Sequence, residues 1–138
     1  MSKLTQCKHL HSRSIVPYLS HSISSLDLSN TKLTTVPETL GHLSALQTLN
    51  LSCNQLTTVP ETLGQLTSFQ NLYLSCNQLT TVAESLGCLT ALQTFDLSCN
   101  QWTTVTETLG QLTCLQTLNL FSNQLTTVPE SVKRIALY

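Results

Sequence analysis

Three cysteines of this chain recur every 23 residues, and an asparagine directly follows each of them. They are Cys53, Cys76 and Cys99. Adjacent strands of a sheet lie about 4.8 Å apart, so thiols repeated on neighbouring strands are close enough for a disulfide to be geometrically possible. Three thiols in a row cannot all pair, however, and the same position holds Asn30 in the first repeat and Ser122 in the last. We therefore expect reduced thiols in a cell interior.

Other groups that could do chemistry are few. Cys7, His9 and His11 alternate, so an extended segment would place them on one face, where zinc could bind. Paired Cys-x-x-Cys spacing is absent, and we predict no metal site. The motifs Gly-x-Ser-x-Gly, the P-loop and His-Glu-x-x-His are also absent. Five glutamates recur in identical surroundings, whereas acid–base catalysis needs environments that push pKa values apart. The sequence thus predicts no enzyme and no cofactor.

The cysteines belong to a repeat that extends over nearly the whole chain. Leu-Thr-Thr-Val, or once Trp-Thr-Thr-Val, recurs every 23 residues, and such self-similarity is typical of solenoids. Each unit fits the pattern L-x-x-L-x-L-x-x-N-x-L-T-T-V-P-E-x-L-G-x-L-x-x. The five units are 23–45, 46–68, 69–91, 92–114 and 115–137. Residues 1–22 lie outside the repeats, and we expect this basic N-terminal segment to form a partial cap.

The pattern predicts the same two elements in every unit. Alternation such as Leu49-Asn50-Leu51 indicates a short strand with one buried face, and the residues that follow are enough for the crossover that parallel strands need. Pro37, Pro60 and Pro129 suit the first residue of a helical turn. Glycines at one shared position are expected to end that turn. These glycines are Gly41, Gly64, Gly87 and Gly110.

On these residues the chain resembles the leucine-rich-repeat family. The opening L-x-x-L-x-L-x-x-N-x-L is that family's signature, and V-P-E-T-L-G-x-L is similar to the 23-residue class found in plant intracellular Ras-group, Ras-suppressor, ROCO and Scribble-type proteins. The resemblance covers residues 23–137. It implies a short α/β solenoid with a curved parallel β-sheet on the concave side and short helical turns on the convex side.

The resemblance also assigns roles to two columns of residues. It implies that a ladder of asparagines is buried and bonds to backbone groups of neighbouring coils. This ladder is Asn54, Asn77, Asn100 and Asn123, with Thr31 as a weaker substitute in the first repeat. It further implies that partners bind the concave strand face. The matching candidates are Asp27, Asn50, Tyr73, Asp96 and Asn119, together with Phe121. We expect Tyr73 and Phe121 to act as anchors, because binding hot spots favour aromatic residues.

Departures from the pattern carry further expectations. Trp102 stands in a leucine position, which we interpret as drift within the core rather than as a ligand-stacking residue. Cys114 replaces small residues, which predicts a buried thiol, whereas Cys88 replaces polar residues and should be exposed. Leu137 and Tyr138 follow the last core position with no later coil to cover them. Either the chain is part of a longer array or another molecule covers this end.

Charge narrows the possible partners. Only 9% of the residues are charged and the net charge is −1, against about 25% charged residues in ordinary domains. The net charge is +3 over residues 1–22, −6 over 23–132 and +2 over 133–138. An acidic solenoid does not suit nucleic acid, and no apolar run reaches the roughly 20 residues that span a membrane.

Together these observations predict a cytoplasmic, non-enzymatic module that binds a protein partner, as a scaffold or a regulator of signalling. A second hypothesis is a structural protein that docks with itself, forming a homodimer through its C-terminal end. A third is a fragment of a larger multidomain leucine-rich-repeat protein.

Overall fold

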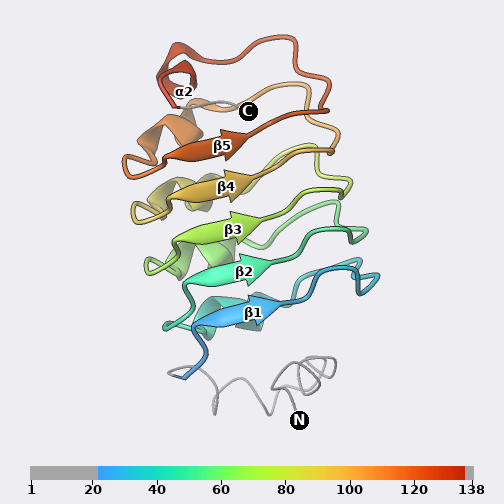
Figure 1. The fold of residues 1–138 in the computed structure, drawn as a ribbon, viewed down its shortest axis with the longest axis vertical. Helices are drawn as coiled ribbons and strands as arrows, with labels where there is room; N and C mark the ends of the chain where they lie inside the picture. The colour runs from blue at the N-terminus through green and yellow to red at the C-terminus, as the bar shows by residue number, and fades with distance from the viewer. Residues whose placement is uncertain (1–21, 136–138) are drawn as a thin grey trace.

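The computed structural model describes residues 22–135, and these residues form a stack of five coils around one parallel sheet (Figure 1). The strands follow one another in chain order. They are β1 (Ser25–Asp27), β2 (Thr48–Asn50), β3 (Asn71–Tyr73), β4 (Thr94–Asp96) and β5 (Thr117–Asn119). Leu26 pairs with Leu49, Leu49 with Leu72, and so on at a constant step. The predicted strands are therefore confirmed, and each coil of the stack is one 23-residue repeat.

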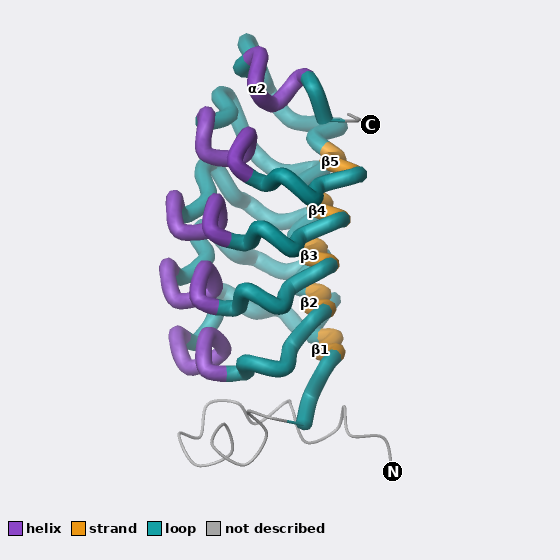
Figure 2. Tube along the Cα trace, turned by 90° about the vertical axis from the view of Figure 1, so that its left-hand side faces the viewer, coloured by secondary structure: helices purple, strands orange, loops and turns teal. Residues whose placement is uncertain are grey.

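Short helices occupy the other side of each coil, opposite the sheet (Figure 2). Four are 3-10 helices and the last is one turn of α-helix. They are η3 (Glu38–His42), η4 (Glu61–Gln65), η5 (Glu84–Cys88), η6 (Glu107–Gln111) and α2 (Glu130–Lys133). Strands on one side and helical turns on the other confirm the predicted α/β solenoid.

The prolines lie one position earlier than predicted. Pro37 is extended, with φ −62° and ψ 135°, and it precedes the first helical residue, Glu38. Its carbonyl accepts the first helical bond from the Leu40 N–H at 3.0 Å. It is therefore the N-cap rather than the first helical residue, and its fixed φ orients the chain as it enters the turn.

The prediction that glycines end these helices is wrong. Gly41 and Gly64 lie within η3 and η4, and no described glycine has a positive φ. Their role is packing between coils. A Cβ on Gly41 would lie 2.5 Å from the Thr62 carbonyl oxygen, and one on Gly64 would lie 2.4 Å from that of Ser85. Only glycine allows the helical sides of successive coils to pack this closely.

The core is a column of leucines that continues through all five coils, broadened by three aromatic side chains. Phe69, Phe95 and Trp102 are fully buried with them. Trp102 is 1% exposed, which confirms that it belongs to the core. Its indole Nε1–H is buried without a hydrogen-bond partner, so this substitution for leucine carries an unsatisfied donor.

The predicted environments of two further cysteines, Cys88 and Cys114, can be compared with the structure. Cys88 is exposed, as expected, but Cys114 is also exposed, so its predicted burial is wrong. Cys114 lies in the turn that connects η6 to β5, and the small residues at this position in the other coils are partly or fully exposed. Separately, none of the helices in the described part is long and apolar enough to cross a membrane.

Candidate protein-binding face

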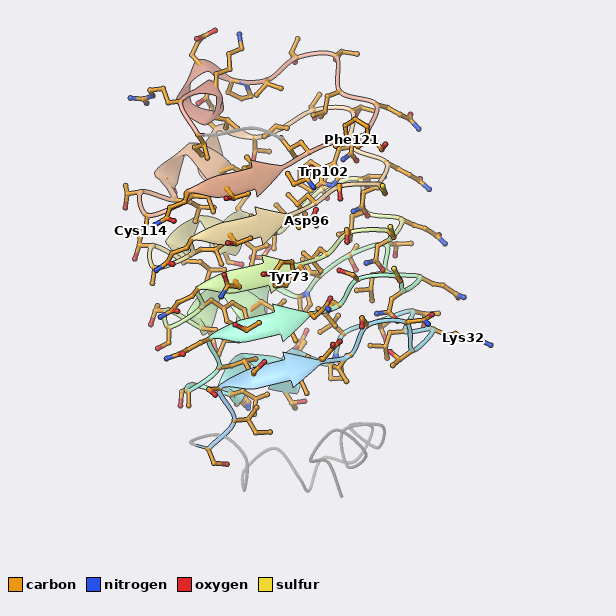
Figure 3. The ribbon with its side chains drawn as sticks, in the orientation of Figure 1. Lys32, Tyr73, Asp96, Trp102, Cys114 and Phe121 are labelled. Atoms are coloured by element: carbon orange, nitrogen blue, oxygen red, sulfur yellow. The ribbon has the colours of Figure 1, made fainter. Side chains whose placement is uncertain are left out.

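Five side chains form a straight column on the outward side of the sheet. The backbone register pairs Asp27 with Asn50, Asn50 with Tyr73, Tyr73 with Asp96 and Asp96 with Asn119. We call this column, together with Phe121 past the end of β5, the strand face; Figure 3 labels Tyr73, Asp96 and Phe121 on it. The residues predicted to bind a partner thus lie on one surface.

Four members of the column have a bond within their own coil. The Ser29 N–H donates to Asp27 Oδ1 at 2.9 Å, and the Ser52 N–H donates to Asn50 Oδ1 at 3.0 Å. Asp96 and Asn119 accept in the same way from the residue two positions on. These Asx-turns close the backbone where each strand ends. The aspartates and asparagines therefore have a structural task besides any contact with a partner.

The Asp27 carboxylate of this column is held in its charged form. The Ser29 side chain is the main cause that lowers the pKa of Asp27, and the Ser29 N–H adds to it. At β4, Asp96 Oδ1 accepts both the N–H and the hydroxyl of Ser98, at 3.0 and 2.7 Å. Hydrogen bonds therefore fix the position of an acidic side chain at β1 and of another at β4.

Two aromatic side chains are the exceptions on this polar surface. Tyr73 is the one member of the column that cannot form an Asx-turn, and it is partly exposed. Phe121 is 69% exposed, and within residues 22–135 no other large hydrophobic side chain is exposed. They are two coils and two residues apart along the face, or about 12 Å at strand spacings. Because this distance is short, one continuous segment of a partner can contact both Tyr73 and Phe121.

The asparagine ladder lies directly behind the strand ends. Asn77 Nδ2 donates to the carbonyls of Leu51 (3.0 Å) and Leu74 (3.1 Å), and its Oδ1 accepts the Leu56 N–H at 3.0 Å. Each asparagine thus bonds its own coil to the preceding one. In the first coil, Thr31 Oγ1 donates to the Leu28 carbonyl at 2.7 Å. This ladder fixes the strand ends from which the strand face projects.

The three cysteines beside the ladder adopt an uncommon backbone conformation. Cys53, Cys76 and Cys99 have φ of 56°, 54° and 53°, in the left-handed region. All three are exposed and unpaired. The pKa of Cys76 is raised to about 11. The main cause is partial desolvation of its thiol, and Cys99 and then Cys53 add to it. Cys76 is therefore protonated at neutral pH.

Other predicted groups lie apart from this surface or outside the described residues. Several predictions concern residues outside the described range. They are the possible metal ligands Cys7, His9 and His11, the partial cap before Ser22, and the C-terminal residues Leu137 and Tyr138. Across residues 22–135, His, Cys, Asp and Glu side chains do not gather in groups of three or more that could hold a metal ion.

Sequence reasoning missed the Asx-turns and the left-handed residues. A signal for the first was readable, because Asp or Asn precedes Leu-Ser in three coils, and serine two residues after an Asx is typical of such turns. A signal for the left-handed residues was also present. The first repeat has Asn30 where the inner repeats have cysteine, and asparagine tolerates a positive φ.

Comparison with known proteins places the chain among repeat proteins. A family profile described as leucine-rich repeat region matches residues 2–136. A leucine-rich-repeat protein of Leptospira interrogans is similar in structure, with a TM-score of 0.61 and 26% identity over 92% of this chain and 44% of that one. The comparison with curated proteins found no match.

Two plant structures are also similar. One is the BIR3–SERK2 complex from Arabidopsis thaliana (TM-score 0.71, 28% identity, 80% of this chain, 62% of that one). The other is the ectodomain of the receptor kinase SOBIR1 from the same plant (0.70, 27%, 81% and 66%). This chain spans less than two thirds of the length of each of these three proteins. With the family profile matching almost its full length, the chain belongs to the leucine-rich-repeat family.

Proposed function

We propose that this chain is a non-enzymatic module that binds a protein partner through its strand face, with Tyr73 and Phe121 as anchors. Phe121 is the observation that carries the proposal, because a phenylalanine exposed to 69% on a Ser/Thr/Asn surface gains most from being covered. Membership of the family supports it, since a similar structure is itself a complex of two proteins.

Charge indicates which partner suits this face. Asp96 on β4 lies next to Tyr73, and Asp27 on β1 lies two strands away on the other side. The solenoid between residues 23 and 132 carries a net charge of −6. A partner with basic residues around an apolar contact is complementary to this surface.

The size of the face sets a further requirement. Five strands about 4.8 Å apart, each about 10 Å long, give roughly 250 Å², whereas a standard interface buries about 800 Å² on each partner. A stable complex must therefore also use the turns that flank the strands. Phe121, which lies past the end of β5, already extends the face in that direction.

A pull-down with the full chain as bait tests this function. We expect the double variant Tyr73→Ala/Phe121→Ala to lose its specific partner. A control variant, His42→Ala/Gln65→Ala, changes two exposed residues on the helical side and should keep it. Fluorescence of the buried Trp102 reports whether each variant is folded. Retention of every partner by the double variant would show that the strand face is not the binding surface.

Self-association through the last coil is the second candidate. Leu125 and Val128 are only partly buried, although their counterparts Leu56 (0%) and Val59 (7%) are buried in an inner coil. A second copy that covers this end would bury them. Light scattering over a range of concentrations should then show a dimer that Leu137→Glu dissociates, whereas a monomer at all concentrations contradicts this candidate.

The cellular setting is part of the proposal. Five exposed, unpaired cysteines within residues 22–135 favour a reducing compartment such as the cytoplasm. There the chain would act as a scaffold or signalling regulator of the 23-residue class, or as one segment of a longer protein.

A further inference from the structure

We propose that Cys53, Cys76 and Cys99, here called the thiol ladder, form a binding site for one soft, two-coordinate cation, with Cu(I) as the physiological ion. The cation would lie between the thiolate of Cys76 and that of one neighbouring coil. This site is separate from the strand face and does not depend on the function proposed for it.

The backbone holds the three thiols in equivalent positions. Their φ values agree within 3°. Each amide N–H donates to a carbonyl of the next coil: Cys53 to Ser75 at 2.9 Å, Cys76 to Ser98 at 3.0 Å and Cys99 to Phe121 at 2.9 Å. The asparagine after each cysteine is anchored in the ladder behind it. The three Cα–Cβ bonds are therefore expected to be nearly parallel and repeat at the coil spacing.

The thiols are also accessible and close to one another. All three cysteines are exposed and carry no disulfide, and the amide of each bonds to the next coil, so the three side chains repeat at the coil spacing of about 4.8 Å. Asn30 and Ser122 end the row in the first and last coils. Cys76 is thus the one cysteine that has a thiol neighbour on each side.

The spacing selects linear coordination. Metal–thiolate bonds of about 2.3 Å, as zinc forms, span about 4.6 Å when two lie in line, close to the coil spacing of about 4.8 Å. The outer thiols are two coils apart, at about 10 Å, and so cannot share one tetrahedral ion. Consistently, within residues 22–135 no three ligating groups gather around one point. Among physiological ions, thiolates select Cu(I) when geometry excludes zinc.

A disulfide fits this spacing less well. It needs Cβ atoms about 3.8 Å apart, roughly 1 Å less than the coil repeat. Closing that gap would strain the backbone bonds that the Cys53 and Cys76 amides make to the next coil. Binding of Cu(I) instead leaves the spacing of the coils unchanged. In this step two thiols and one Cu(I) form a dithiolate complex of charge −1 and release two protons.

The test uses the full chain with Cys7, Cys88 and Cys114 replaced by serine, so that only the thiol ladder remains. Cu(I) is titrated anaerobically against a competing chelator, and thiolate-to-copper charge transfer is followed in the ultraviolet. We expect one tightly bound Cu(I). Cys76→Ser should weaken binding by more than the roughly 10–100-fold that loss of a supporting hydrogen bond costs.

Single and double variants of the outer cysteines distinguish the ladder from independent thiols. Cys53→Ser and Cys99→Ser should each weaken binding only about twofold, because one complete pair remains. Cys53→Ser/Cys99→Ser should match Cys76→Ser. X-ray absorption should show two sulfur ligands on copper. Full affinity in the Cys76→Ser variant, or three or more sulfur ligands, would overturn the proposal, and Trp102 emission confirms that each variant is folded.

Discussion

Two asparagine-rich columns follow the same period in this solenoid but differ in what holds them. In the buried ladder, the amide of Asn77 bonds to four backbone groups, two in its own coil and two in the preceding one. In the strand face, Asn50 accepts one bond from its own coil. The ladder is asparagine in four coils, whereas the strand face varies and includes Tyr73. The backbone bonds therefore restrict the first column to asparagine or a substitute such as Thr31 that can also bond to the backbone. The second column is freer to vary and to acquire a binding role.

The sharpest test of this difference replaces one asparagine from each column. Asn77→Ala leaves the buried Leu56 N–H without its acceptor and should cost about 3 kcal/mol of the free energy of unfolding. Asn50→Ala removes one part-buried bond and should cost about 0.5–1 kcal/mol. Urea unfolding, followed by Trp102 fluorescence, measures both. Equal losses would show that the two columns do not differ in this way.

The same contrast applies on the helical side, between an inner and the outermost glycine. Gly64→Ala places a Cβ 2.4 Å from the backbone oxygen of Ser85 and should destabilise the chain by about 2–3 kcal/mol. A Cβ on Gly110 would meet mainly the side chain of Ser131, at 2.6 Å.

A second substitution distinguishes a clash with a side chain from a clash with the backbone. Ser131→Gly should restore most of the stability lost in Gly110→Ala, because it removes the side-chain atoms that the new Cβ would contact. Ser85→Gly should not rescue Gly64→Ala, because the clashing carbonyl remains. Thermal unfolding of the four variants provides the measurement, and rescue of both would contradict a backbone clash at Gly64.

The repeat alone was enough to predict the strands and the buried leucines, and the family resemblance added the role of the asparagine ladder. These features depend on residue type and period, which the chain shows directly. The role of Gly64 was not predictable, because it depends on the distance between two coils, and glycine is equally typical of a helix end. Cys114 was predicted wrongly because a small residue suits both a tight core and an exposed turn.

The candidate site was predictable in position but not in the task of each side chain. Register follows from the period, so Asp27 and Tyr73 had to share a column. That Asp27 also closes a turn depends on the backbone direction after the strand, which only coordinates show. Without them, a structural carboxylate and a binding carboxylate look alike.

The thiol ladder offers a smaller test of how backbone conformation acts on a column. In metal-free, reducing buffer, Cys76→Asn should raise the free energy of unfolding by about 0.5–1 kcal/mol, because asparagine adopts φ near 54° at lower cost than cysteine. Cys76→Ala keeps the unfavourable φ and should bring no gain. A gain of equal size from alanine would assign the effect to the thiol instead of the backbone.

The smallest expected effect concerns the charge on the strand face. The Ser29 side chain is the main reason that the pKa of Asp27 is lowered, so Ser29→Ala should raise this pKa toward the usual value for an aspartate. Because the folded-state pKa lies below the unfolded one, the ionised Asp27 stabilises the fold above the unfolded pKa, and this contribution is lost as the pH falls through the folded pKa. The variant should therefore lose less stability on acidification. A carboxyl NMR titration measures the shift, with Ser75→Ala as a control, since that hydroxyl bonds to Ser52 instead. An unchanged Asp27 titration in Ser29→Ala would contradict this cause and would assign the lowered pKa to the Ser29 N–H and the Asn50 side chain instead.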